Sequence, residues 1–141
     1  MLKLRLRVYS DGASRGNPGI SAIAFMIMTE EGRLLKRYSK YVGVRTSNQA
    51  QYEALISALE SASKLTDQEV TCCMDSELVV KQLNGEYKVR NPTLKTLWLK
   101  VQELKQCFRR MTLKSVPRTD TNIKQVDRLA NQALDRVKNN L

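Results

Sequence analysis

The spacing of apolar residues changes along this chain from a period of two to a period of about 3.6, and this change limits the possible folds. Residues 2–9 alternate apolar and polar side chains, which is typical of a strand with one buried face. After a loop over residues 11–19, two more strands are expected over 21–28 and 33–42, and short connections make the three an antiparallel meander. Apolar residues then recur at helical spacing, which predicts an amphipathic helix over residues 48–63.

The second half of the chain alternates between strand and helix patterns. Short apolar runs predict strands over residues 70–74 and 111–116. Helices are expected over 76–83, over 93–107 and along an apolar stripe from 126 to 137. Three meander strands followed by helix, strand, helices, strand and helix predict an α/β fold, with a five-stranded mixed sheet flanked by helices.

Size and charge bound the class of partner. A chain of 141 residues fits one domain, so we expect a single domain over residues 1–141. Lys and Arg number 24 against 14 Asp and Glu, and the net charge of +10 favours an anionic partner, although solubility alone is an alternative. No apolar run approaches the roughly 18 residues of a spanning helix, and no signal-peptide pattern follows Met1. We therefore expect a cytoplasmic protein that binds nucleic acid rather than a membrane.

The residues capable of binding a metal are restricted by the absence of histidine. Histidine-based acid–base catalysis and histidine ligation are excluded. Cys72, Cys73 and Cys107 have neither the spacing of a metal site nor that of a disulfide framework, and we expect them to be core residues. Any metal must therefore be held by oxygen atoms, which favours hard cations such as Mg²⁺ or Mn²⁺.

Three aspartates are candidates for chemistry. Asp11 and Asp75 each follow the apolar residues of a predicted strand, and ligands of α/β sheets favour strand ends. Asp11 has an alternative role as a turn residue before Gly12, and Asp75 has one as a helix N-cap before Ser76. Asp127 lies beside the apolar stripe of the last predicted helix, where a charge needs compensation.

Carboxylates that converge on one sheet edge repel each other unless cations lie between them. Phosphodiester cleavage with two metal ions uses such an arrangement, with one ion generating hydroxide and the other stabilising the leaving oxygen. The carboxylates then act as ligands rather than as nucleophiles.

The segments that carry these aspartates resemble known motifs. Residues 9–19 (YSDGASRGNPG), residues 74–79 and residues 126–130 are similar to motifs of the type I ribonucleases H, in the archaeal-like branch. The resemblance covers nearly the whole chain in order and spacing. It implies an endonuclease that hydrolyses the RNA strand of RNA:DNA hybrids with two Mg²⁺ ions, Mn²⁺ being an alternative. Asp11, Asp75 and Asp127 would be catalytic metal ligands.

One motif departs from the family pattern. The family has Thr-Asn-Asn, two residues and then a metal-binding Glu, whereas residues 46–51 end in Gln51. Glu53 is the alternative ligand, but side chains two positions apart on a helix point about 200° away from each other, so it could take this role only with a shift of the helix. Glu53 shares a polar, solvated face with Glu60 and Lys64. We assign the metal-binding and catalytic position to Gln51, and the neutral amide predicts impaired or absent cleavage.

The resemblance also implies substrate contacts. Arg118 takes the place of a histidine found in many relatives and would hold a phosphate, the alternative being an ordinary surface arginine. Recognition of RNA 2′-hydroxyls is expected without base reading. The residues expected to line this groove or to meet the DNA phosphate are Gly12, Ala13, Ser14, Asn17, Thr46, Asn48, Gln49 and Ser76.

Alternatives to this function remain at this point. The chain could be a catalytically silent module that binds RNA:DNA hybrid, or a related phosphoryl-transfer enzyme such as an integrase or junction resolvase. The full set of motifs argues against the latter. Double-stranded RNA is a further possible substrate, and no protein partner is evident, so a monomer is expected.

Overall fold

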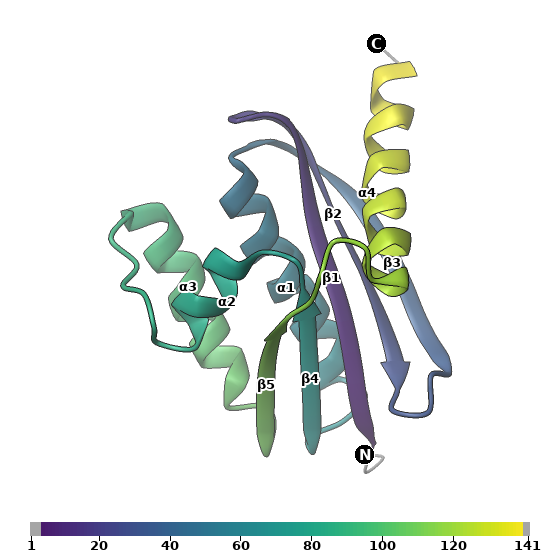
Figure 1. The fold of residues 1–141 in the computed structure, drawn as a ribbon, viewed down its shortest axis with the longest axis vertical. Helices are drawn as coiled ribbons and strands as arrows, with labels where there is room; N and C mark the ends of the chain where they lie inside the picture. Colours follow the sequence, from purple (N-terminus) through teal and green to yellow (C-terminus); the bar gives the residue numbers. More distant parts are fainter. Residues whose placement is uncertain (1–3, 140–141) are drawn as a thin grey trace.

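The computed structural model describes residues 4–139, and within that range the chain forms one five-stranded sheet and four helices (Figure 1). The elements follow in the order β1 (Arg5–Gly16), β2 (Gly19–Thr29), β3 (Leu34–Arg45), α1 (Ser47–Ser63), β4 (Glu69–Met74), α2 (Glu77–Leu83), α3 (Pro92–Lys105), β5 (Arg110–Ser115) and α4 (Thr121–Asn139).

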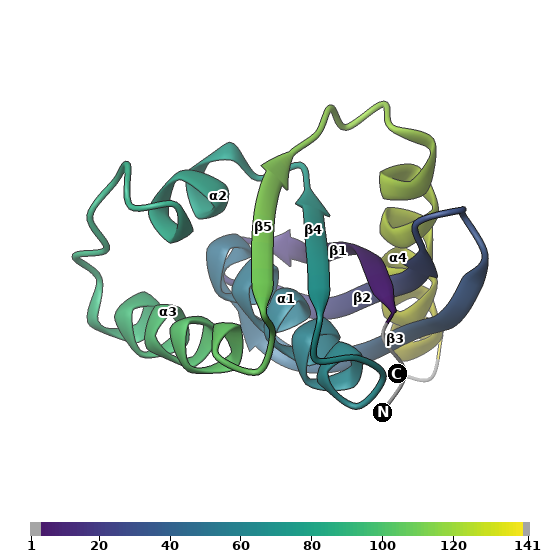
Figure 2. The ribbon, with the colours of Figure 1, turned by 90° about the horizontal axis from the view of Figure 1, so that it is seen from below.

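The sheet is mixed, as the sequence predicts. Its strand order is β3-β2-β1-β4-β5, in which β1, β2 and β3 are antiparallel neighbours and β4 and β5 run parallel to β1. Helices α1 and α3 lie on one face and α4 lies on the other (Figures 1 and 2). This arrangement puts the carboxyl end of β4 next to the middle of β1, because Tyr9 pairs with Cys73 and Asp11 follows two residues later.

The prediction of a loop over residues 11–19 is wrong. Strand β1 continues to Gly16, and its pairing with β2 extends from Leu6 to Gly16, leaving a tight turn before Gly19. Asp11 is therefore a strand residue that pairs with Ala24, not a turn residue. The alternating pattern misses this because residues 10–16 lack the large apolar side chains that usually mark a strand.

The other predicted elements exist, with shifted ends. Strand β3 extends to Arg45, and α4 begins at Thr121, ahead of the apolar stripe that predicted it. Of the first predicted strand, Leu2 and Lys3 lie outside the described residues. Ser76 rather than Asp75 is the N-cap of α2, since its hydroxyl accepts a hydrogen bond from the Val79 backbone N–H.

Two apolar clusters stabilise the two faces of the sheet. The larger joins β1, β2 and β4 to α1, α2 and α3, and the smaller joins the sheet to α4. Cys72 and Cys73 are buried in these clusters as expected, but Cys107 is exposed, so its assignment to the core is wrong. Among the described residues, no helix is both long and apolar enough to cross a membrane.

Candidate active site

Asp11 lies at the centre of the candidate site, and it is only 4% exposed. Alternation along β1 directs it to the same face as Tyr9, which packs in the cluster beneath α4. Gly12 points the other way, toward α1, where an added Cβ would lie 2.3 Å from the backbone carbon of Ala50. This close approach brings the first turn of α1 to the edge of β1.

Gln51 reaches Asp11 from α1. Its Nε2 donates hydrogen bonds to Asp11 Oδ1 at 2.9 Å and to the Gly12 carbonyl at 3.2 Å. Its Oε1 is buried and accepts no hydrogen bond from the described residues. The amide thus donates to the acidic residue with one end and leaves an oxygen without a partner at the other.

Glu53 lies elsewhere, in an ion pair with Arg45 at 2.9 Å, with its side chain 25% exposed. The prediction that Glu53 does not share the position of Gln51 agrees with this placement. The expectation of a solvated polar face is wrong at this residue, because β3 extends far enough for Arg45 to cover it.

The pKa of the Asp11 carboxyl is raised to about 7. Burial is the largest cause, and the negative charges of Asp75 and Asp127 add to it, while the hydrogen bond from Gln51 lowers the pKa. Asp75 and Asp127 are therefore both close enough to act on the Asp11 carboxyl. Their repulsion of this carboxyl is the kind of electrostatic stress that a cation relieves.

Asp127 is exposed on α4, so the expectation that its place beside the apolar stripe requires compensation is wrong. The buried stripe of α4, which includes Val126 and Ala130, lies to one side of Asp127 around the helix. Asp127 nevertheless faces the site, because it lines the same pocket of about 320 Å³ as Asp11 and Gln51.

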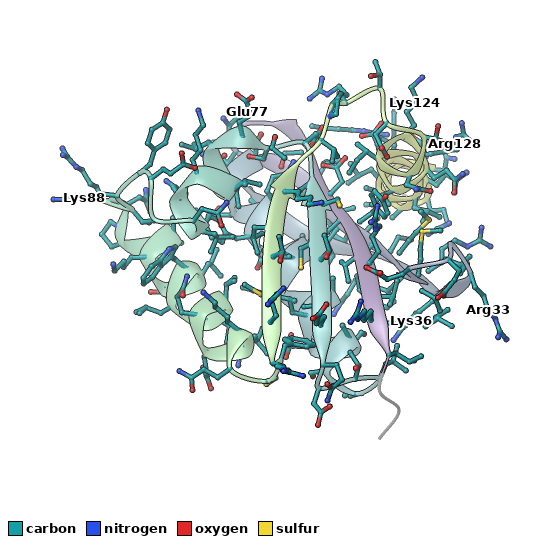
Figure 3. The ribbon with its side chains drawn as sticks, turned by 60° about the horizontal axis from the view of Figure 1, so that its bottom comes forward. Arg33, Lys36, Glu77, Lys88, Lys124 and Arg128 are labelled. Carbon is teal, nitrogen blue, oxygen red and sulfur yellow. The ribbon has the colours of Figure 1, made fainter. Side chains whose placement is uncertain are left out.

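Asp75 and Arg118 close the site from the neighbouring strands. Asp75 directly follows β4, and Arg118 lies in the connection from β5 to α4. Arg118 Nε donates to Asp75 Oδ2 at 3.4 Å, and its side chain is 92% exposed. Figure 3 shows Glu77, at the start of α2, and Lys124, in the first turn of α4, at the same edge of the molecule. The contact from Arg118 therefore connects Asp75 to the segment between β5 and α4.

The residues expected to contact substrate divide into two groups. Gly12, Ala13 and Ser14 line the pocket beside Asp11. The others lie at helix starts or in the β1–β2 turn: Thr46 and Gln49 form the capping box of α1, Ser76 caps α2, Asn48 lies in the first turn of α1, and Asn17 Oδ1 accepts from the Ser47 backbone N–H.

The donor set fits a hard divalent cation only in part. All the candidate ligands offer oxygen, and Gln51 Oε1 is a buried acceptor without a partner. No three carboxylates among residues 4–139 stand close enough to hold an ion as they are, so binding requires side-chain rotation. Gln51 supplies no charge, and its N–H group occupies the Asp11 oxygen that a cation would otherwise contact.

Sequence reasoning missed the polar residues that surround Asp127. Asn131 donates to Asp127, and Arg15 contacts both Asn131 and Asp135. The spacing of 127, 131 and 135 is the signal that could have found them, since residues four apart on a helix are neighbours.

The sequence of this chain is similar to one family model and to several known proteins. The family model described as reverse transcriptase-like matches residues 9–133. Ribonuclease HI of Halobacterium salinarum is 39% identical over 131 residues, which are 93% of this chain and 65% of that protein. The bifunctional protein Rv2228c of Mycobacterium tuberculosis is 38% identical over 133 residues, which are 94% of this chain and 36% of that protein. The chain thus spans less than two thirds of these relatives.

Two solved structures match this chain over almost their full length. The N-terminal RNase H domain of the M. tuberculosis protein superposes with a TM-score of 0.91 at 37% identity, covering 98% of this chain and 99% of that one. LC11-RNase H1, solved in complex with RNA/DNA hybrid, gives a TM-score of 0.88 at 38% identity, covering 94% and 99%.

Proposed function

The chain belongs to the ribonuclease H family, and we propose that it binds RNA:DNA hybrids and hydrolyses their RNA strand at the Asp11 site. Gln51 should make this hydrolysis slow or absent. The observation that carries the proposal is the pocket lined by Asp11, Asp127 and Gln51, whose amide donates to Asp11. The charge of Asp75, at the end of β4, acts on the same Asp11 carboxyl. LC11-RNase H1, a relative with the same fold, was solved with such a hybrid.

Ribonucleases H generally use divalent metal ions. When bound, two Mg²⁺ or Mn²⁺ ions would activate the attacking water and stabilise the leaving oxygen. Asp11, Asp75 and Asp127 would hold them, with Gln51 contributing Oε1 if its amide turned over. Because the site offers three negative charges where the family motif has four, we expect weak metal binding.

The residues of the chain orient the substrate. Backbone groups at Gly12 and Ala13 and the hydroxyl of Ser14 line the pocket beside Asp11, where they would meet RNA 2′-hydroxyls. Asn17 and Thr46 lie next to the start of α1, and a helix N-terminus favours a DNA phosphate. Contacts of this type read sugar and phosphate rather than bases, so cleavage independent of sequence follows.

Arg118 would hold a phosphate of the RNA strand. Its guanidinium contacts Asp75 and is otherwise exposed at the mouth of the pocket. A guanidinium can pair with a phosphate through its charge and hydrogen bonds, but it is a poor general base.

A second candidate function is a catalytically silent hybrid-binding module. The hydrogen bond from Gln51 to Asp11 favours it, because an amide N–H partly satisfies the buried carboxylate without a cation. In this case the chain would bind hybrid and leave both strands intact with or without Gln51→Glu.

A strand-specific assay separates the two functions. Hybrid with its RNA and DNA strands labelled differently is incubated with the Gln51→Glu variant and Mg²⁺. We expect cleavage of the RNA strand alone, and none in the matched Gln51→Glu/Asp11→Asn variant. Intact RNA in the first reaction would reject the nuclease and leave the binding module.

Binding tests the substrate class independently of cleavage. The net charge of +10 predicts that affinity falls as salt rises, and the 2′-hydroxyl groove predicts tighter binding to hybrid than to DNA duplex of the same sequence. Equal affinity for both duplexes at physiological salt would contradict the groove assignment. A single domain, a monomeric state, a cytoplasmic location and activity on double-stranded RNA remain predictions.

A further inference from the structure

Asp127 is the one exposed acidic residue of the candidate site, and polar contacts hold it. An aspartate on the outer side of a helix has rotational freedom, and fixing a side chain in one rotamer costs entropy. Here Asn131, one turn further along α4, donates from Nδ2 to Asp127 Oδ1 at 3.2 Å and to the Asp127 carbonyl at 3.0 Å. The second of these bonds fixes the amide on the helix, and the first holds the carboxylate.

Arg15 determines which way the Asn131 amide faces. Its Nη2 pairs with Asp135 at 2.6 Å and lies 3.4 Å from Asn131 Oδ1 and 3.3 Å from the Asn131 carbonyl. The guanidinium is on one side of the amide and the Asp127 carboxylate on the other. If the amide were turned over, its NH₂ group would face the cation and its oxygen would face the anion. The charges on both sides therefore select the observed orientation.

We propose that Asn131 is a positioning residue that holds Asp127 toward Asp11 for metal binding, and that Arg15, anchored by Asp135, acts through Asn131. The inference rests on the proposed function, since it concerns the same metal-binding carboxylates. It adds residues on β1 and α4 that act through Asp127 rather than as metal ligands themselves. Arg15 also connects the end of β1 to α4, so the strand that carries Asp11 helps orient the helix that carries Asp127.

The expected loss of metal affinity can be judged from residues that orient metal ligands in other proteins. Losing a residue that orients a metal ligand typically lowers metal affinity about 10- to 100-fold. Asn131→Ala removes the donor itself, so we expect a loss at the lower end of this range, about tenfold. Arg15→Ala leaves the amide free to turn over, and we expect a smaller loss.

Calorimetric titration of Mn²⁺ into the metal-free Gln51→Glu protein tests the proposal, with the four variants Asn131→Ala, Arg15→Ala, their combination and Gln132→Ala. Gln132 is the next residue on α4, exposed and turned away from Asp127, so it is the matched control. We expect weaker Mn²⁺ binding in the first two variants, no further loss when Arg15→Ala is added to Asn131→Ala, and no change in Gln132→Ala. Additive losses or unchanged affinity in Asn131→Ala would overturn the proposal.

A metal-free measurement keeps this test separate from the proposed function. The side-chain amide resonances of Asn131, followed by NMR, should shift on Asp127→Asn and on Arg15→Ala, and should be unaffected by Gln132→Ala. If Gln51→Glu binds no Mn²⁺ but these shifts occur, the metal function fails while the contact from Arg15 through Asn131 to Asp127 stands. If the resonances do not respond, the positioning role is wrong whatever the metal affinity. Thermal unfolding of each variant identifies any loss of fold.

Discussion

The two helices that carry the acidic site reach it by different physical means. On one face, α1 packs on β1 through the large apolar cluster, and Gly12 lets the Ala50 backbone approach within a distance that no side chain would permit. On the other face, α4 packs through a smaller cluster and presents an exposed Asp127, held by Asn131. Backbone contact therefore places the Gln51 position, whereas side-chain hydrogen bonds place Asp127.

This difference predicts how the two faces respond to change. A change on the α1 side alters a fixed position, so its effect on the site should be large. A change on the α4 side releases one of several weak contacts, each worth about 0.5–1.5 kcal/mol, so its effect should be graded.

The largest effect is expected from Gln51→Glu. The carboxylate would restore a fourth negative charge and remove the N–H group that now occupies Asp11. Metal ions contribute several kcal/mol to such transition states, and about 1.4 kcal/mol is a tenfold change in rate, so we expect a gain of at least roughly 100-fold. Initial rates on labelled hybrid with Mg²⁺ measure it, and the unchanged chain should cut very slowly or not at all.

Glu53→Gln in the Gln51→Glu protein is the matched control, because it makes the reverse change two residues along the same helix. Glu53 pairs with Arg45 rather than with the site, so little change in rate is expected. Ordinary turnover by the unchanged chain, abolished by Glu53→Gln, would mean that Glu53 is the ligand and that the assignment of Gln51 is wrong.

The pH dependence of stability is the second prediction. Burial and two neighbouring carboxylates raise the pKa of Asp11 from 3.8 to about 7, so between these values the folded metal-free protein binds a proton that the unfolded chain does not. The contribution of Asp11 to the free energy of unfolding is therefore fully present below about pH 4 and is lost as pH rises toward 7. At about 1.4 kcal/mol per pKa unit, the loss has an upper limit of about 4 kcal/mol.

Urea unfolding between pH 4 and pH 8, in the presence of a chelator, measures this dependence. Asp11→Asn should flatten the curve, since its amide cannot ionise, and the unchanged chain should lose more stability over the same interval. Curves of identical slope would show that Asp11 does not titrate in this range.

The pattern of apolar residues predicted the antiparallel meander and the helices, because burial leaves a period in the sequence. The three aspartates were chosen by their places next to apolar runs and by the family resemblance, and their role as ligands stays a prediction. It did not predict that Asp11 lies within a strand, since small and polar residues can form a paired strand where neighbouring elements cover them. Nor could it place Arg45 on Glu53 or Asn131 between Arg15 and Asp127. Those contacts join segments far apart in the chain, and no local period records them.

Gly12→Ala tests the backbone contact that fixes α1. The added methyl group would lie 2.3–2.6 Å from backbone atoms of Ala50 and Gln51, which cannot move without shifting the helix. We expect a loss of about 3 kcal/mol in the free energy of unfolding, the upper part of the range for overpacking. Gly85→Ala is the control, because Gly85 has a φ of +80° but nothing within 4 Å of an added Cβ. Strain there should cost about 1 kcal/mol. A larger loss from Gly85→Ala would contradict the close-approach argument.

Arg118→Ala, in the Gln51→Glu protein, should give the smallest effect on stability and a measurable one on turnover. The ion pair with Asp75 is largely exposed, and such pairs contribute about 0–1 kcal/mol, so the melting temperature should hardly change. If Arg118 holds a phosphate, its removal should slow turnover and reduce the salt dependence of hybrid binding by roughly one unit of slope. Arg110→Ala makes the same charge change at the start of β5, the opposite end of the strand that precedes Arg118. Both variants lose one positive charge, so a difference between them in turnover or in salt dependence requires a contact made by Arg118 itself. If the two variants show equal effects, Arg118 is an ordinary surface arginine.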